Sequence, residues 1–385
     1  MPGGITRFEF ATATRIVFGE GTAREVAAAA RAMGQRPLLV TGASADRAEF
    51  LHKGLQPAAS IRISGEPEIS HIREGAGYAR GERCDVVVAI GGGSVIDAGK
   101  ALAALLTNPG DPLDYLEVIG LGQPLEHPAA SLIAVPTTAG TGSEVTRNAV
   151  LASPEHQVKA SLRSAYMLPR LAVVDPELTL GLPPAVTAAS GLDALTQLIE
   201  PYVSVRANRM TDMFCADGIP RAAAALPQVW DDPSGRRARG DMAWASLLGG
   251  MSLANAALGA VHGFAAPLGG MFSAPHGALC AALLPHVMEA NVRALRARAA
   301  GSPVVGRYEQ VARWLTGRPE ASAEEGVEWV AALCRKLCIP PLRRYGVERE
   351  AIPQVVARAA RASSMKGNPI PLSEEELAGI LARAL

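Results

Sequence analysis

The sequence predicts an α/β domain built around a parallel sheet, followed by a domain made only of helices. Over the first half of the chain, short apolar runs alternate with helical patterns, which is typical of βαβ units covered on both faces of the sheet. From about residue 182 the strand patterns stop, and long Ala- and Leu-rich helical patterns follow. The 385 residues are enough for two domains. We therefore divide the chain into residues 1–182 and 183–385.

The expected elements of the first domain follow one another in order. Strands are predicted at 36–42, 60–64, 84–94 and 131–138, where short apolar runs end in glycine or threonine. Helices are predicted between them at 22–33, 69–83 and 94–107. The Pro- and Gly-rich residues 110–128 are expected to form a loop, and 146–175 a hairpin that leads into a strand over LAVVD.

Composition excludes several classes of function. The chain has 37 basic and 37 acidic residues, so its charge points to neither nucleic acid nor an anionic membrane as a partner. The N-terminus lacks the pattern of a secretory signal. Residues 242–271 are apolar but rich in Gly and Ala and contain Asn255 and His262, which favours a buried helix over a membrane span.

The five cysteines form no C-x-x-C pair, and their odd number favours a reducing cytoplasm. Cys334 and Cys338 are spaced to share a helix face, and we interpret them as small buried hydrophobic residues.

A glycine-rich turn joins the clearest strand to a helix in AIGGGSVIDAGK (89–100). Gly91, Gly92 and Gly93 can adopt positive φ and let a ligand approach the backbone. Ser94 and Asp97 have the spacing of a capping box, and the free N–H groups at the helix start favour a phosphate. The alternative is a tight turn with a good cap.

A second loop of this kind, PTTAGTGSEVT (136–146), follows the next strand and offers the hydroxyls of Thr137, Thr138, Thr141 and Ser143. Two such loops at the carboxyl ends of adjacent strands form a crevice suited to a dinucleotide. Ordinary Thr/Gly turns are the alternative.

The helical half contains a candidate metal site. Asp193 and Gln197 stand four residues apart in GLDALTQLIE, so they share a helix face. His262 and His276 follow in VHGFAAPLGGMFSAPHG. One carboxylate and two imidazoles suit three ligands of a metal ion, with Gln197 at the position of a fourth. Buried histidines of the core are the alternative.

At these motifs the chain resembles the iron-containing (group III) alcohol dehydrogenases of the dehydroquinate synthase-like superfamily. The matching stretches run in family order over nearly the whole length: FEFATATRIVFGEG, VAIGGGSVIDAGKA, AVPTTAGTGSEVT, LAVVDPELT, GLDALTQLIEPYVS, GAVHGFAAPLGGMFSAPHG and LLPHVMEAN. The resemblance implies an N-terminal dinucleotide-binding domain, an all-helical metal and substrate domain, a cofactor and metal in the cleft between them, and a homodimer or larger homo-oligomer.

Carried over by motif, the resemblance assigns cofactor-binding roles to Gly92, Gly93, Ser94, Thr138, Thr141, Lys159 and Leu178. It assigns three of the four metal ligands to Asp193, His262 and His276. The chain departs from the family at Gln197, where a fourth histidine ligand is usual, and at Ala266, where a further histidine is often present. His286 matches a position that is not a ligand.

The departure at Gln197 leaves three interpretations of the site: a centre that binds metal weakly, a centre that uses a different metal, or a site without metal. If a metal binds, the sequence leaves open whether it is Fe or Zn. A neutral amide oxygen is a poorer ligand than imidazole for Fe²⁺ or Zn²⁺. Catalytic zinc commonly has only three protein ligands, and Asp193, His262 and His276 meet that number. Without a metal, His262, His276 or Gln197 would have to donate hydrogen bonds to the developing oxyanion.

The resemblance implies reversible hydride transfer between a nicotinamide cofactor and a small alcohol or carbonyl compound. NAD-preferring relatives tend to hold an acidic residue where this chain has Gly42, while Ser44 and Arg47 could hold a 2′-phosphate. We therefore favour NADP over NAD, with ribose binding by Asp46 as the alternative. The other functions considered are a metal-independent reductase like the maleylacetate reductases and a non-catalytic ligand-binding protein.

Overall fold

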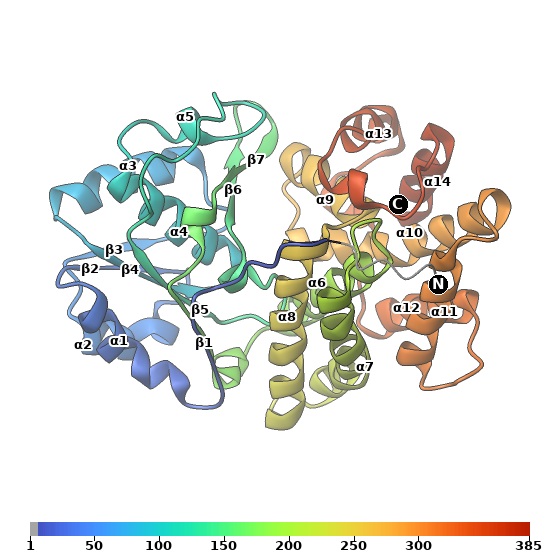
Figure 1. Cartoon of the computed structure of the whole chain (residues 1–385), viewed down its shortest axis with the longest axis horizontal. Helices are drawn as coiled ribbons and strands as arrows, with labels where there is room; N and C mark the ends of the chain where they lie inside the picture. The colour runs from blue at the N-terminus through green and yellow to red at the C-terminus, as the bar shows by residue number, and fades with distance from the viewer. Residues whose placement is uncertain (1–6) are drawn as a thin grey trace. The chain divides into compact units, whose positions relative to one another are not determined.

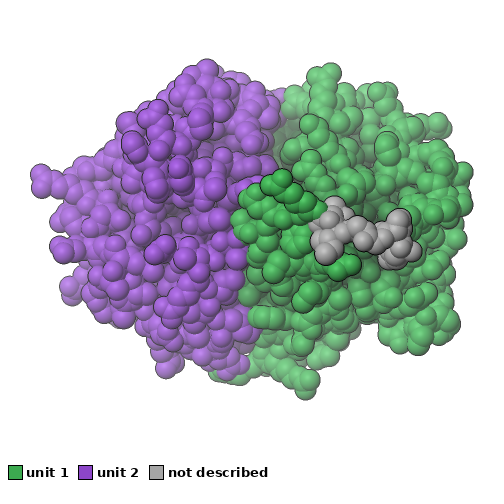
Figure 2. All heavy atoms as spheres, viewed as in Figure 1, with its two compact units in different colours: residues 1–11, 183–385 green, residues 12–182 purple. Residues whose placement is uncertain are grey.

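The computed structural model describes residues 7–385, apart from the side chains of Ala45 and Asp46, and divides into two compact units (Figures 1 and 2). One unit is Thr12–Leu182, and the other is Pro183–Leu385 together with the segment up to Ala11. This division differs from the predicted one at the N-terminus. The side chain of Asn255 accepts a hydrogen bond from the Ala11 N–H at 2.7 Å and donates one to the Ala11 carbonyl at 2.9 Å, which attaches this segment to the helical unit.

The α/β unit contains a six-stranded, fully parallel sheet in the order β1-β8-β5-β4-β2-β3. Its strands are β1 (Ile16–Phe18), β2 (Pro37–Thr41), β3 (Ala59–Arg62), β4 (Val86–Gly91), β5 (Ser131–Pro136) and β8 (Leu171–Val174). The strands predicted from the apolar runs are confirmed, and the short edge strand β1 is an addition. The predicted hairpin is also confirmed, as the antiparallel pair β6 (Asn148–Ser153) and β7 (Val158–Arg163).

Helices cover both faces of this sheet. They are α1 (Val26–Met33), α2 (Glu49–Leu55), α3 (Ile69–Gly81) and α4 (Gly93–Thr107), with the short α5 (Pro112–Tyr115) in the predicted loop. Leu38 and Val87 belong to one hydrophobic cluster, while their neighbours Leu39 and Val88 belong to a second. Because successive side chains of a strand point to opposite faces, a strand buried on both sides is a continuous apolar run.

Within residues 183–385 the regular structure is entirely helical, as predicted. Its α-helices are α6 (Pro184–Val203), α7 (Arg209–Asp231), α8 (Arg236–Ala256), α9 (Ala260–Met271), α10 (His276–Arg298), α11 (Pro303–Thr316), α12 (Ala323–Lys336), α13 (Ile352–Ala359) and α14 (Glu374–Ala384). Helix α6 is buried along most of its length. Gly218 on α7 lets this partner approach closely, because a Cβ there would lie 2.7 Å from Leu198 of α6.

The apolar run 242–271 forms two helices rather than the single buried helix expected. Helix α8 ends at Ala256, α9 begins at Ala260, and the two are bent by 97°. Over the described residues, no single helix has the length and apolar character needed to cross a membrane; the bent pair α8–α9 meets those criteria only jointly. Ala257 at the bend has φ 62° and ψ 167°, a conformation that residues other than glycine rarely adopt.

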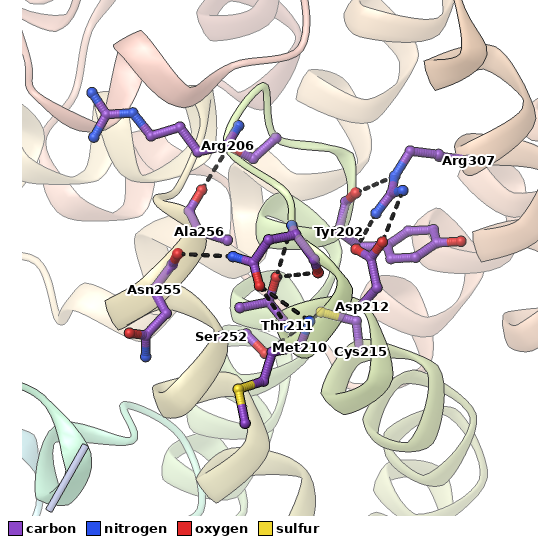
Figure 3. Close-up of polar contacts among 12 residues, drawn as sticks. Tyr202, Arg206, Met210, Thr211, Asp212, Cys215, Ser252, Asn255, Ala256 and Arg307 are labelled. Atoms are coloured by element: carbon purple, nitrogen blue, oxygen red, sulfur yellow. Dashed lines mark hydrogen bonds and ion pairs between the residues drawn. The ribbon is translucent and has the colours of Figure 1, made fainter. Parts of the chain in front are cut away.

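A polar network fixes the end of α6 against its neighbours (Figure 3). Arg307 of α11 donates to the carbonyl of Tyr202 and to the carboxylate of Asp212. Asn208 caps α7 and donates from its amide to the carbonyl of Asn255 at 3.1 Å. The network therefore ties α6, α7, α8 and α11 together at one end.

The interpretation of the two C-terminal cysteines is wrong for one of them. Cys334 lies half-buried in α12, but that helix ends at Lys336. Cys338 lies beyond its end, with φ 53° and an exposed side chain. The two residues therefore share no helix face.

Candidate nucleotide and metal sites

The glycine-rich turn lies where β4 runs into α4. The predicted capping box is wrong: Gly92 is the N-cap of α4, Ser94 lies inside the helix, and no described side chain caps it. A long helix whose first N–H groups lack a side-chain acceptor is suited to bind an anion. Strands β4 and β5 are paired in register from Val86–Ser131 to Gly91–Pro136, so the turn and the Thr-rich loop begin side by side.

The three glycines serve different purposes, and none has positive φ. A Cβ at Gly91 would lie 2.5 Å from Val95, and one at Gly93 would lie 2.6 Å from Thr141, so both glycines are needed for packing. A Cβ at Gly92 would meet only Thr138, at an ordinary 3.6 Å. Gly92 is therefore the one position of the three that the protein's own packing leaves open.

A buried lysine that the sequence analysis missed ties the second loop to α4. Lys100 is fully buried, and its Nζ donates to Ser143 Oγ at 2.7 Å, to Thr146 Oγ1 at 2.8 Å and to the Asn148 carbonyl at 2.8 Å. Asp97, one turn earlier, accepts from Ser143 Oγ at 2.5 Å and from the Val150 N–H at 2.9 Å. Asp97 of α4 and Ser143 of the loop thus hold the loop against the helix.

Thr137 is buried, while Thr138 and Thr141 are half-buried. Thr138 and Thr141 therefore keep part of their surface accessible, on the loop that Lys100 and Asp97 hold in place.

The other predicted cofactor residues lie around the same sheet. Gly42 and Ser44 follow β2, with Ser44 exposed. Arg47 donates to the Leu178 carbonyl at 2.7 Å, which brings these two residues together. Lys159 on β7 is paired with Glu66 at 3.0 Å. The side chain of Asp46 lies outside the described residues.

The predicted metal-binding residues come together in the helical unit. Asp193 and Gln197 lie on α6, His262 on α9, and His276 is the first residue of α10. Asp193 Oδ1 lies 3.4 Å from His262 Nε2 and 3.8 Å from His276 Nε2. Asp193 and His262 are buried, whereas the side chain of His276 is 35% exposed. This convergence favours a shared site over separate buried histidines of the core.

Glu200, two turns after Asp193 on α6, orients His262. Its Oε2 atom lies 2.6 Å from His262 Nδ1, and its Oε1 atom accepts from the Val261 N–H at 2.7 Å. A carboxylate that accepts from one ring N–H leaves the other ring nitrogen with a free lone pair. This is the usual arrangement at a metal-binding histidine. The free Nε2 is the atom that faces Asp193.

Two buried oxygens in this site, Asp193 Oδ1 and Gln197 Oε1, have no hydrogen-bond partner in the described part of the chain. The amide nitrogen of Gln197 donates to the other Asp193 oxygen, Oδ2, at 3.0 Å. Buried acceptors without donors are costly. A cation bound between the imidazoles would satisfy Asp193 Oδ1, so the residues present fit a divalent metal ion.

The electrostatics of the cluster point the same way. Burial alone would raise the pKa of Asp193, but the facing imidazoles outweigh it, so this pKa is lowered. Burial alone would lower the pKa values of His262 and His276, but Cys280 and Asp193 outweigh it, so both are raised. All three directions follow from the attraction between the acidic and the imidazole side chains that this pocket brings together.

The sequence analysis missed two further members of this site, Cys280 and Glu200. Cys280 is fully buried on α10, and its Sγ lies 3.6 Å from His276 Nε2 and 3.8 Å from His262 Nε2. The available signal was spacing, because Cys280 stands four residues after His276 and Glu200 seven after Asp193, on the same helix faces. Ala266, one turn after His262, is exposed, and His286 is half-buried farther along α10.

Comparisons with known proteins place both halves of the chain in one family. Residues 13–176 match the family model described as iron-containing alcohol dehydrogenase, and residues 187–385 match that of the C-terminal part of the same family. Alcohol dehydrogenase 4 of Saccharomyces cerevisiae is 36% identical over 333 residues, 86% of this chain and 84% of that protein.

Solved structures are similar over nearly the whole chain. A crystal structure of 1,3-propanediol oxidoreductase has a TM-score of 0.88 at 33% identity, covering 99% of this chain and 100% of the other. Sulfoacetaldehyde reductase from Bifidobacterium kashiwanohense, in complex with NAD⁺, has a TM-score of 0.84 at 27% identity, with 98% of each chain covered.

Proposed function

The chain belongs to the iron-containing alcohol dehydrogenase family, and from that premise we propose which residues carry its chemistry and which cofactors it takes. It is an oxidoreductase that interconverts an alcohol and an aldehyde or ketone. The family uses a nicotinamide dinucleotide and a metal ion. The observation that carries the proposal is the convergence of Asp193, His262 and His276 from three helices.

The proposed metal-binding residues are Asp193, His262 and His276, with Gln197 beside them on α6. A divalent metal bound there supplies a Lewis acid that polarises a carbonyl oxygen and stabilises an alkoxide. Glu200 holds His262 by its Nδ1 so that Nε2 stays directed into the site. Gln197 orients the Asp193 carboxylate through its amide N–H. The partial exposure of His276 marks the accessible side of the cluster.

The proposed dinucleotide site lies at the carboxyl ends of β4 and β5. The N–H groups at the start of α4 bind the pyrophosphate, and Gly92 permits its close approach. Thr138 and Thr141 offer further hydroxyl groups from the neighbouring loop. Lys100 and Asp97 hold that loop in place through their hydrogen bonds with Ser143, a residue of the loop.

NADP(H) is the proposed cofactor because the residue after β2 is Gly42, which offers no carboxylate to repel a 2′-phosphate. Ser44 is exposed nearby, and Arg47 is held at Leu178 with guanidinium donors to spare. A homodimer or larger homo-oligomer, expected from the resemblance, stays a prediction that sedimentation analysis can check.

The test is a turnover assay of the purified protein with short aldehydes and either NADPH or NADH. We expect NADPH oxidation that falls after dialysis against a chelator and returns with Zn²⁺, Fe²⁺ or Mn²⁺. His276→Ala should abolish this activity, whereas His286→Ala, on the same helix but outside the cluster, should keep it. Chelator-insensitive turnover with an active His276→Ala would contradict the metal assignment and leave the dehydrogenase assignment standing.

A further inference from the structure

We propose that Sγ of Cys280 is a protein ligand of the metal ion, at the site where the family's fourth histidine is replaced by Gln197. The inference rests on the metal-dependent part of the proposed function. It assigns the metal-binding set Asp193, His262, His276 and Cys280, whose ligand atoms all lie within 4.8 Å of one another.

The distances between these atoms fit a tetrahedral ion. Metal–ligand distances of about 2.1 Å for N or O and about 2.3 Å for S give edges of about 3.4 Å between N or O donors and about 3.6 Å between N and S. Asp193 Oδ1 lies 3.4 and 3.8 Å from the two imidazole Nε2 atoms. Cys280 Sγ lies 3.6 and 3.8 Å from the same two atoms. These are four of the six edges of the tetrahedron and lie within about 0.4 Å of its values; the other two edges are no longer than 4.8 Å and reach these values by a contraction of the cluster around the ion.

Helix geometry places the thiol where it is needed. Cys280 follows His276 by one turn of α10, so both side chains project from the same face. Cys280 is fully buried, and its sulfur lies within hydrogen-bonding range of the Nε2 atoms of both histidines. Asp193 Oδ1, which is buried without a hydrogen-bond partner among the described residues, provides an independent indication of a cation in this cluster.

Gln197 is the weaker candidate for this role. Its Oε1 atom is also buried without a hydrogen-bond partner among the described residues, but this neutral oxygen is a poor match for a borderline-soft ion. A thiolate and a carboxylate together balance the two charges of the ion, and the imidazoles remain neutral ligands. Thiolate and imidazole donors favour Zn²⁺ over Mn²⁺ or Mg²⁺. Zinc sites in enzymes can expand to five ligands, so four protein donors still admit a substrate oxygen.

The experiment loads the chelator-dialysed protein with Co²⁺ and records the near-ultraviolet thiolate-to-cobalt charge-transfer band. Wild type should show the band, and Cys280→Ser should lose it. Cys334→Ser, a matched substitution of a half-buried cysteine on α12, should keep it. Zinc affinity, measured by competition with a chromogenic chelator, should fall about tenfold or more in Cys280→Ser relative to Cys334→Ser. Cys280→Ala, with folding checked by circular dichroism, should behave as Cys280→Ser.

The outcomes separate this inference from the proposed function. Cobalt binding without a sulfur band, with unchanged zinc affinity in Cys280→Ser, would overturn the Cys280 assignment and leave the metal site in place. Loss of the band in Gln197→Leu but not in Cys280→Ser would likewise overturn it. Failure of the wild type to bind Co²⁺ or Zn²⁺ would overturn both the inference and the metal-dependent part of the proposed function.

Discussion

Gly92 provides the sharpest test of the proposed nucleotide site, because its neighbours separate packing from ligand binding. We predict that Gly92→Val keeps the fold but loses cofactor affinity. The backbone at Gly92, with φ −72° and ψ −176°, lies in the extended region that β-branched residues readily adopt. A Cβ there is 3.6 Å from Thr138, an ordinary contact. The protein therefore has room for a Cβ at this position, and the added side chain is expected to occupy the space that a pyrophosphate needs.

The magnitudes follow from the contacts. Losing one hydrogen bond to a charged phosphate costs about 1.5–3 kcal/mol, which raises the Kd for NADPH roughly tenfold to a hundredfold. Gly93→Ala should instead lower the stability of the fold, because its Cβ would lie 2.6 Å from Thr141. Overpacking of this kind lowers the free energy of unfolding by about 1–3 kcal/mol.

Calorimetric titration with NADPH measures the affinity, and urea-induced unfolding of the apoprotein measures the stability. The free energy of unfolding of Gly92→Val should lie within about 1 kcal/mol of the parent, since replacing a glycine also lowers the entropy of the unfolded chain. An unchanged Kd in a stable Gly92→Val would refute the reasoning. So would a stability loss at Gly92 equal to that at Gly93.

Four further substitutions test other parts of the account. Gly42→Asp should erode or reverse the ratio of kcat/KM for NADPH over NADH, and a strong native preference for NADH would contradict the cofactor assignment. Gln197→His should raise zinc affinity about tenfold or more in chelator competition, by adding an imidazole one turn from Asp193. Burial raises the pKa of Glu144 to about 7 from 4.5, so its neutral form stabilises the fold below pH 4.5 and that contribution is lost as pH rises through 7. Glu144→Gln should match the parent near pH 4 and exceed its unfolding free energy at pH 8 by up to about 3 kcal/mol, whereas a difference that does not change with pH would contradict the linkage. Ala257→Gly should stabilise the protein by about 1 kcal/mol by relieving its backbone strain, and a lower midpoint in urea would exclude that strain.

Much of the fold follows from pattern alone. The strands of the parallel sheet are buried on both faces, so β2, β4 and β5 are continuous apolar runs that the sequence displays directly. The change from alternating to purely helical patterns near residue 182 is equally visible. The attachment of Ala11 to Asn255 could not be predicted, because one amide side chain joins positions 244 residues apart.

The residues that converge in the candidate site were predictable from the sequence, and those that position them were not. Asp193, His262 and His276 stand in recognisable motifs, whereas Glu200 acquires its role only where α9 brings His262 Nδ1 to within 2.6 Å of it. Cys280 was overlooked because an isolated cysteine in an apolar helix reads as a small hydrophobic residue.

The glycine-rich turn was wrongly interpreted as one of positive φ, and the approach of a ligand to its backbone stays a prediction. Gly91 and Gly93 are required instead because the side chains of Val95 and Thr141 pack against them, a contact that the sequence alone does not show.

The central claim, that three helices assemble a metal centre although Gln197 replaces a histidine, is tested most directly by diffraction at the zinc absorption edge from crystals grown with Zn²⁺. We predict an anomalous peak about 2.1 Å from Asp193 Oδ1 and from the Nε2 atoms of His262 and His276, and about 2.3 Å from Cys280 Sγ. Zinc-soaked crystals without a peak among these atoms, in an enzyme that turns over normally, would contradict the claim.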